Sequence, residues 1–552
     1  MGTVDSALRG RPRRGIAESS GSPKWGVVLG NTRFRNTVRL LFLAFALCLH
    51  LACSAAQDTL LWFDHGRPTS QAIQAAEFLT TADLDGLAPA DYHAQPLRKA
   101  LDQAAHGPMQ PASAIAELDA ALTAAMQRYL LDLHQGRLDP RVIHQYFKAP
   151  PATTYFDAAT YLSNAVASNQ LPEAVHLATP RIPLYAKLRQ ALAEYRQLLG
   201  HPAWKIDLAV IPGKKLEPGQ AYEGMAVLTQ RLVALGDLRA NTPVPARYEG
   251  ALVDGVRAFQ QRHGLLDDGI LGNATFKQLQ VMPARRVRQI ELTLERLRWT
   301  PLLQAPRMVV VNIPEFVLRA YEVRDGKATV RVKMKIIVGS ALDKRTPVFD
   351  EDMRFIEFSP YWNVPLSIAR SEVIPRLRRD PGYFQQQGFE FVTKGGQPIS
   401  TLSDANLLAV QQGQLRIRQR PGPHNALGDI KFVFPNDQNI YLHHTPVPQL
   451  FDRDRRDFSH GCIRVEDPVS LARFVLQDDP EWTEKRIRDA MSSGTSKTIR
   501  LKQPLRVLIT YSTVIVNNDK VYFFPDVYAQ DDLLENVLRH RVRADPLSVP
   551  VQ

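Results

Sequence analysis

The sequence has very little cysteine, with three residues in a chain of 552: Cys48, Cys53 and Cys462. The first two lie in an apolar segment typical of targeting signals, so removal of that segment would leave Cys462 alone. A single thiol excludes an internal disulfide. In an oxidising compartment a lone cysteine is either paired between molecules or kept for its reactivity. The preceding residues, His460 and Gly461, favour the reactive role.

The sequence also has little that could span a membrane. The apolar run within residues 40–57 is only about a dozen residues long, which is short for a span and right for the core of a signal peptide. Residues 1–39 carry eight Arg or Lys against two acidic residues, and Ser54-Ala55-Ala56 is a small-residue cleavage site. We therefore expect residues 1–56 to export the chain to the periplasm. A retained anchor in the inner membrane and lipoprotein cleavage before Cys53 are the alternatives.

The charge balance does not require a nucleic-acid partner. The formal net charge is +12, of which +6 falls in residues 1–39, so the rest of the chain has a modest excess that would suit an anionic polymer. An apolar fraction of 45% and a charged fraction of 22% are those of an ordinary globular protein, so long disorder is not expected. The length predicts roughly three or four domains.

The region 57–210 is rich in Ala, Leu and Gln and shows helical periodicity. Within residues 116–133 the apolar side chains recur at spacings of three and four, which predicts an amphipathic helix. Pro-containing breaks separate several such helices. We expect a helical scaffold domain, because no group of residues here demands chemistry.

The region 217–280 predicts a compact unit of three helices. Its pattern resembles the peptidoglycan-binding module of many wall enzymes: Val256, Phe259, Gln260, His263-Gly264-Leu265, Asp268-Gly269, Gly272, Thr275 and Leu279. Phe259 and Leu279 belong in the core of such a unit, and Gly269 supplies the turn before the last helix. His263 is expected to be a helix-terminal histidine rather than a ligand. The resemblance implies binding of glycan strands.

The periodicity changes after a charged connecting helix expected at 284–304. Runs of β-branched residues divided by turns predict a β-rich domain at 306–510, with strands at 308–313, 316–323, 330–338, 354–358, 429–434, 439–442 and 507–516. A helical, basic insertion at about 360–420 interrupts these strands and is expected to act as a lid. Residues 511–552 are expected to add a strand and a helix that pack on this domain. The fold class is therefore multidomain α+β.

The chemistry concentrates between Tyr441 and Asp467, where His443, His460 and Cys462 occur together. A cysteine with a nearby histidine is the minimum equipment for thiolate acyl transfer, because the base removes the thiol proton. The same three side chains are also a sensible zinc ligand set. They lack a fourth ligand at a characteristic spacing, so the zinc alternative is the weaker one, and no metal or cofactor is expected.

The domain at 306–510 resembles the L,D-transpeptidase catalytic family, also called the YkuD domain. The family pattern is a histidine followed seventeen to twenty residues later by Ser-His-Gly-Cys and a hydrophobic residue, which His443 and Ser459-His460-Gly461-Cys462-Ile463 match. Further matching blocks are Val311-Asn312-Ile313-Pro314, Thr346-Pro347, Tyr361-Trp362-Asn363-Val364-Pro365, Asp380-Pro381-Gly382-Tyr383, Gly388-Phe389, Asn425-Ala426-Leu427-Gly428 and His443–Pro446. Nearly all of the mature chain resembles the long exported members, which combine a helical scaffold, a peptidoglycan-binding module and a substrate-capping insertion.

The resemblance implies a role for each residue of this stretch. Cys462 is the expected nucleophile, His443 the base, His460 a supporting residue, and Gly461 part of an oxyanion hole made by backbone amides. Substrate-binding candidates are Arg464, as a partner for a carboxylate, and Tyr361, Trp362 and Asn363 as groove residues. Arg464 is equally well explained as a structural ion-pair residue, and the Tyr-Trp pair as core.

The implied reaction is the formation of 3→3 cross-links between peptidoglycan stem peptides, with release of D-alanine. Such an enzyme acts in cell-wall organisation and cell shape, has stem peptides as donor and acceptor, and has other cell-wall synthases as candidate partners. The resemblance also implies acylation by carbapenems. A hydrolase that trims stems or releases wall-bound protein, and a wall-binding scaffold without catalysis, are the competing interpretations.

His444 departs from the pattern of the long members, in which an acidic residue more usually follows the first histidine. Adjacent residues on a strand point to opposite faces, so His443 and His444 are not expected to face Cys462 together. The base is assigned to His443 because it holds the position of the motif.

Overall fold

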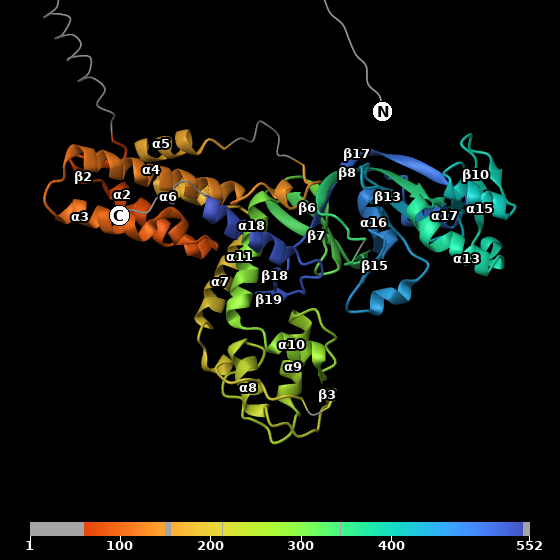
Figure 1. Cartoon of the computed structure of the whole chain (residues 1–552), viewed down its shortest axis with the longest axis horizontal. Coiled ribbons are helices and arrows are strands. Elements are labelled where there is room, and N and C mark those ends of the chain that lie inside the picture. Colours follow the sequence, from red (N-terminus) through yellow and green to blue (C-terminus); the bar gives the residue numbers. More distant parts are fainter. Residues whose placement is uncertain (1–59, 149–155, 212, 343, 545–552) are drawn as a thin grey trace, which may run out of the picture. The chain divides into compact units, whose positions relative to one another are not determined.

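The computed structural model describes residues 60–148, 156–211, 213–342 and 344–544 (Figure 1). The expected signal segment, with Cys48 and Cys53, lies outside these residues, and Cys462 is a free cysteine. Within the described ranges, no helix is long and apolar enough to cross a membrane. The chain from Leu61 onward forms one compact unit.

The region after Leu61 is helical, as its periodicity predicts. Its elements are the short strands β1 (Phe63–Asp64) and β2 (Arg67–Pro68) and the helices α2 (Ser70–Thr80), α3 (Ala94–His106), α4 (Ala112–Gln135), α5 (Ala158–Ala167), α6 (Leu171–Ala178) and α7 (Pro183–Gln197). The expected helix at 116–133 lies within α4, which buries Leu122, Met126 and Leu130 in a core formed with α2, α3, α5 and α6. This arrangement confirms the helical N-terminal region.

A second helical unit follows, with its own core. It contains strands β3 (Lys215–Leu216) and β4 (Leu271–Gly272) and helices α8 (Met225–Ala234), α9 (Ala251–Arg262) and α10 (Asn273–Leu279). Phe259 and Leu279 are buried in this core, as expected, and Gly269 has a positive φ of 73° in the turn before α10. His263 is the C-cap residue of α9, and its Nδ1 lies 2.7 Å from the carbonyl oxygen of Phe259. His263 is thus at the helix terminus, as expected, and it is also buried.

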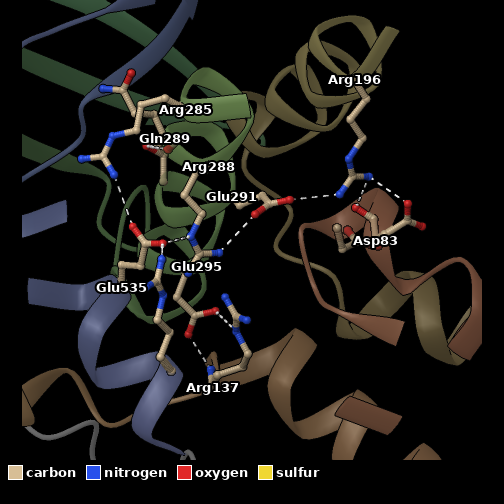
Figure 2. Close-up of polar contacts among 12 residues, drawn as sticks. Asp83, Arg137, Arg196, Arg285, Arg288, Gln289, Glu291, Glu295 and Glu535 are labelled. Carbon is tan, nitrogen blue, oxygen red and sulfur yellow. Dashed lines mark hydrogen bonds and ion pairs between the residues drawn. The ribbon is translucent and has the colours of Figure 1, made fainter. Parts of the chain in front are cut away.

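Helix α11 (Pro283–Trp299) carries seven charged residues, and four of them are buried: Arg286, Glu295, Arg296 and Arg298. Figure 2 shows Glu291 of α11 facing Arg196 of α7, with 3.1 Å between Oε1 and Nη2, while Arg196 also reaches Asp83. Glu295 is fully buried and accepts hydrogen bonds from the backbone and guanidinium of Arg137. Helix α11 therefore forms ion pairs with α7 and with Arg137, which follows α4, so it connects segments that are distant in the sequence.

The C-terminal residues form a hairpin and a helix: β18 (Val514–Asn517), β19 (Lys520–Phe523) and α18 (Gln530–Ala544). Val514, Val521 and Phe523 pack with apolar residues of α7 and α11, and Leu534 and Leu538 of α18 pack on Leu292 of α11. The segment between β19 and α18 contacts the β-rich domain. In this segment the hydroxyl of Tyr528 donates to the carbonyl oxygen of Gly339, at the end of β7, at 2.5 Å.

The β-rich domain is built on one nine-stranded sheet. Its strands are β5 (Arg307–Asn312), β6 (Val317–Arg324), β7 (Lys327–Gly339), β8 (Phe349–Phe358), β13 (Ile430–Val433), β14 (Leu442–His443), β15 (Asp457–Ser459), β16 (Ile463–Val465) and β17 (Lys497–Thr510). Their order is β15-β7-β16-β14-β13-β8-β17-β5-β6, and β6 pairs again with β7, so the sheet closes on itself. Alternating residues of these strands fill a large apolar core, and the helices α16 (Pro468–Val475) and α17 (Glu484–Ser492) add to it.

Several of the expected strands are wrong in their extent. The strand expected at 354–358 is only the second half of β8, and two others are shortened or divided. The strand expected at 439–442 is limited to β14, because Asn439 has a positive φ of 53° and the side chain of Asn436 holds a turn by accepting from the N–H groups of Gln438 and Ile440. The strand expected at 507–516 is divided between the end of β17 and the start of β18. Local polar turn chemistry overrides β propensity at the first site.

The expected insertion occupies the chain between β8 and β13 (Figure 1). Its elements are β9 (Trp362–Asn363), α12 (Leu366–Ile368), a π-helical segment η6 (Ala369–Val373), α13 (Ile374–Arg379), α14 (Gly382–Gln386), β10 (Phe389–Val392), β11 (Pro398–Ile399), α15 (Asp404–Gln411) and β12 (Arg416–Gln419). The four strands form a separate sheet, and Ile374, Phe391 and Leu407 belong to a separate core. The capping insertion therefore has the organisation of a small subdomain.

Candidate active site

Strand alternation places the candidate residues on one face of the closed sheet. β14 and β16 are parallel neighbours, with Leu442 opposite Ile463 and His443 opposite Arg464. Leu442 and Ile463 are fully buried in the core of the sheet. Because side chains alternate along a strand, His443 and Arg464 point to the other face, where Cys462, two residues before Arg464, also belongs.

Cys462 directly precedes β16 and is only partly exposed. Its Sγ is 3.5 Å from the carbonyl oxygen of Asn439. Burial raises the pKa of this thiol, while hydrogen bonds from Tyr441 and the positive charges of Lys431 and Arg464 act in the opposite direction. The net effect is a raised pKa, so the free thiol is mostly protonated at neutral pH and needs a base.

His443, the residue expected to act as the base, is buried. Its Nδ1 is 2.5 Å from the carbonyl oxygen of His444, which places a proton on Nδ1, and the backbone of Leu427 is a second hydrogen-bond partner of the ring. Burial first, and the charge of Arg464 second, lower the pKa of His443 to about 3. The ring is therefore neutral at physiological pH. Among the described residues no hydrogen bond joins this ring to the Cys462 thiol, so proton transfer requires a small movement or a bridging group.

Two residues of the site were missed by the sequence reasoning. The ring of Tyr441 lies edge-on to the ring of His443, with 5.7 Å between centroids, and its hydroxyl lies beside the Cys462 thiol. Lys431 of β13 is opposite His443, and its Nζ lies 4.4 Å from the centre of the Tyr441 ring. Glu357 of β8 forms an ion pair with Lys431, with 3.1 Å between Oε2 and Nζ. Spacing could have found Tyr441, which stands two residues before His443 and so shares its face of the strand.

His460 points away from the thiol and toward the capping insertion. Its Nε2 lies 2.6 Å from a carboxylate oxygen of Glu372, and the same oxygen is 2.8 Å from Nζ of Lys344. The described side-chain partner of His460 is thus Glu372 of the insertion, and no described hydrogen bond joins its ring to the thiol. The loop that carries Cys462, residues 459–462, is called the nucleophile loop below.

The nucleophile loop is fixed by internal hydrogen bonds. Ser459 Oγ donates to the carbonyl oxygen of Cys462 at 2.5 Å and accepts from the N–H of Gly461 at 3.2 Å. Gly461 has a φ of 113°, a conformation that favours glycine. Its own amide is thus engaged, and among the described residues the N–H of Cys462 has no acceptor. The expected oxyanion hole would be centred on the Cys462 amide rather than that of Gly461.

The four predicted substrate residues fall into two groups. Arg464 is half-buried beside Cys462, and within the described chain its Nε has no hydrogen-bond partner. Burial lowers the pKa of its guanidinium. Tyr361, Trp362 and Asn363 instead make their described contacts inside the capping insertion, where the Tyr361 ring lies 4.1 Å from Arg418 and Trp362 and Asn363 form β9. The structure brings Arg464 to the thiol and leaves the other three in the insertion.

His444 faces away from the site, as strand alternation predicts. Its Nδ1 is 2.7 Å from Asp429 Oδ1, and it borders a pocket of about 290 Å³. The pocket is lined by Ser359, Gly422, Pro423, Gly428, Asp429, His444, Pro446, Met491, Ser492 and Gly494. Among the residues with described positions, no group of three or more His, Cys, Asp or Glu side chains is arranged to hold a metal. The alternative zinc set of His443, His460 and Cys462 is not assembled, because each residue has a different partner.

Comparison with known proteins covers most of the described chain in three segments. Residues 306–494 match the profile described as "L,D-transpeptidase catalytic domain", residues 54–192 match "Scaffold domain", and residues 222–279 match "Putative peptidoglycan binding domain". These segments coincide with the β-rich region, the helical N-terminal region and the small helical unit.

Two curated proteins are similar to parts of the chain. A protein of Haemophilus influenzae named "Putative L,D-transpeptidase" is 30% identical over 223 residues, which are 40% of this chain and 44% of that protein. The pig protein "Epoxide hydrolase 1" is 22% identical over 124 residues, 22% of this chain and 26% of that protein, a match too short and divergent to support an assignment. The chain thus spans less than half the length of the curated relatives it matches. The chain contains an L,D-transpeptidase catalytic domain of the YkuD type, combined with a scaffold domain and a peptidoglycan-binding domain.

Proposed function

We propose that this protein is a murein L,D-transpeptidase that forms 3→3 cross-links through a thioester on Cys462. The observation that carries the proposal is the arrangement around the thiol. Cys462 lies on one sheet face with a neutral, buried His443, the Tyr441 hydroxyl and two cationic side chains, Lys431 and Arg464. This set supplies a nucleophile, a base and positive charge for an anionic intermediate.

The first half of the reaction transfers the acyl group of the donor stem. His443 removes the thiol proton, and the Cys462 sulfur attacks the carbonyl between the L-centre of the position-three diamino acid and the terminal D-alanine. The C–N bond breaks, the amine leaves as D-alanine with the proton from His443, and a thioester remains. The lowered pKa of His443 favours the second of these proton transfers, from the imidazolium to the leaving amine, and disfavours the first, from the thiol to the neutral ring.

The second half resolves the thioester. The side-chain amine of a neighbouring stem attacks the thioester carbonyl, the C–S bond breaks, and the thiol of Cys462 recovers a proton. Water as the attacking group would instead release a tripeptide stem, so the same site also supports L,D-carboxypeptidase or hydrolase activity. The helical unit at 217–280 would hold glycan strands near the catalytic domain, and the N-terminal segment would place the enzyme in the periplasm.

Arg464 is the best candidate to bind a carboxylate of the substrate. Its buried Nε has no partner among the described side chains, and a buried unpaired guanidinium nitrogen is costly unless a ligand satisfies it. The cationic surroundings of Cys462 also fit the carboxylate of a carbapenem. We expect carbapenems to acylate Cys462, and most penicillins to do so poorly.

Purified tetrapeptide muropeptides test the proposed function. Incubation with the wild-type protein should give tripeptide–tripeptide dimers and free D-alanine by mass spectrometry, and Cys462→Ala should give neither. Tripeptide monomers with D-alanine, but without dimers, would show a hydrolase. Unchanged products with Cys462→Ala would refute the thioester mechanism.

A further inference from the structure

One carboxylate of the capping insertion reaches the nucleophile loop. Glu372 belongs to η6, and its Oε1 lies 2.6 Å from Nε2 of His460 and 2.8 Å from Nζ of Lys344. His460 stands two residues before Cys462, and Lys344 lies in the loop between β7 and β8. The carboxylate thus joins two segments of the catalytic domain to one residue of the insertion.

The two partners of Glu372 belong to loops that are bonded to each other. Thr346 Oγ1 donates to the carbonyl oxygen of Gly461 at 2.7 Å and accepts from the N–H of Gly339 at 2.9 Å. A Cβ atom at Gly461 would lie 3.8 Å from the carbonyl oxygen of Lys344. The Lys344 loop and the nucleophile loop therefore pack as one unit. A displacement of Lys344 or His460 would also displace the backbone next to Cys462.

On its other side Glu372 is anchored in the core of the insertion. Its neighbour Val373 is buried there, and η6 continues directly into α13, where Ile374 and Leu377 are buried. A π-helical turn inside α-helical sequence is frequent at functional sites. Because the insertion has its own sheet and core, contacts such as those of Glu372 fix its position on the catalytic domain.

We propose that Glu372 is a positioning residue that couples closure of the capping insertion over the acyl donor to alignment of the loop that carries Cys462. This inference rests on the proposed function, because it assumes that the donor binds beneath the insertion. The side chains of Glu372, His460 and Lys344 are 43%, 35% and 33% exposed, so the ion pairs are partly screened and individually weak. The proposed effect of these ion pairs is to connect the capping insertion to the catalytic domain, and not to stabilise the fold.

Charge exchange between Glu372 and Lys344 tests the coupling in the full-length enzyme. Glu372→Gln should lower kcat/KM for the tetrapeptide donor by about three- to tenfold, and Glu372→Lys should lower it further because it places like charges together. Adding Lys344→Glu to Glu372→Lys should restore kcat/KM to within about threefold of the wild type. A matched control is Glu484→Gln on α17, which removes an exposed carboxylate that also has two ion-pair partners, Arg473 and Arg488.

Hydrogen exchange tests the same coupling without any substrate. In Glu372→Gln the backbone amides of residues 366–379 and of residues 459–463 should exchange faster together, whereas Glu484→Gln should change neither segment. Faster exchange confined to 366–379, or a kcat/KM within twofold of the wild type, would overturn the proposal. If wild-type protein transforms no stem peptide, the proposed function fails, and the exchange result alone decides whether Glu372 couples the two segments.

Discussion

His443 and Arg464 occupy directly opposite positions on the parallel strands β14 and β16. The imidazole is buried, and after burial the nearby guanidinium is the next cause that lowers its pKa to about 3. Burial, with a smaller contribution from the Arg464 guanidinium, thus lowers the pKa of His443 and keeps its imidazole neutral at physiological pH.

Replacing Arg464 with Met should therefore raise the pKa of His443. Below that pKa the ring is protonated and cannot accept the thiol proton, so the acid limb of the kcat/KM profile should move to higher pH by about one unit. The check is a pH–rate series with the tetrapeptide donor, with Arg473→Met on the exposed face of α16 as the control. An acid limb at the same pH in both variants would contradict the role given to Arg464.

The Cys462 thiol should titrate above the usual range of a free cysteine. Burial raises its pKa more than Tyr441, Lys431 and Arg464 lower it. The rate of alkylation by iodoacetamide should then rise with pH and reach its midpoint above the ordinary value of about 8.5. A midpoint well below neutrality would show a preformed thiolate–imidazolium pair.

Lys431 should assist the thiolate. Its ammonium lies above the Tyr441 ring and helps to lower the pKa of Cys462, so Lys431→Met should raise that pKa further and slow alkylation at a fixed pH by several-fold. Lys431→Arg should retain most of the rate. Lys502→Met is a matched control, because it also removes a lysine paired with a carboxylate, Asp479 at 3.4 Å. Equal alkylation rates in all variants would contradict an effect of Lys431 on the pKa of Cys462.

Glu295 should be the most sensitive charged position for stability. Burial raises its pKa, but Arg137 and Arg298 outweigh burial, and the net pKa is lowered. Glu295→Ala would leave two buried guanidinium groups without their carboxylate, at a cost of about 3–5 kcal/mol. Chemical denaturation should show a large decrease in midpoint for this variant. Asp519→Asn, in an exposed pair with Lys187, should change little, and equal midpoints would contradict the analysis.

The stabilisation from Glu295 has a defined pH dependence. Because its pKa is lower in the folded state, the contribution is fully present above the ordinary carboxyl pKa and is lost as the pH falls through the lowered value. The wild type and Glu295→Ala should therefore approach each other in stability under acid conditions. A gap that stays constant down to low pH would exclude the ion pairs as its source.

Residue patterns predicted the parts of this structure that depend on local periodicity and motif spacing. Period-two alternation separated His443 from His444, and helical spacing located α4. Alternation also predicts that Tyr441 lies beside His443, although Tyr441 is not part of the histidine–cysteine motif. The partner of His460 could not be predicted, because Glu372 is 88 residues away and meets it only through the packing of two separate cores. The same limit applies to Lys431, whose approach to Tyr441 depends on the register of β13 with β14.

Acid quenching during turnover tests the central claim most directly. Intact-mass spectrometry of the wild-type protein with a tetrapeptide donor should show an adduct equal to the donor less D-alanine, and peptide mapping should locate it on Cys462. Cys462→Ser under the same conditions should show none. An adduct on another residue, or one that persists in Cys462→Ser, would contradict the assignment of Cys462 as the nucleophile.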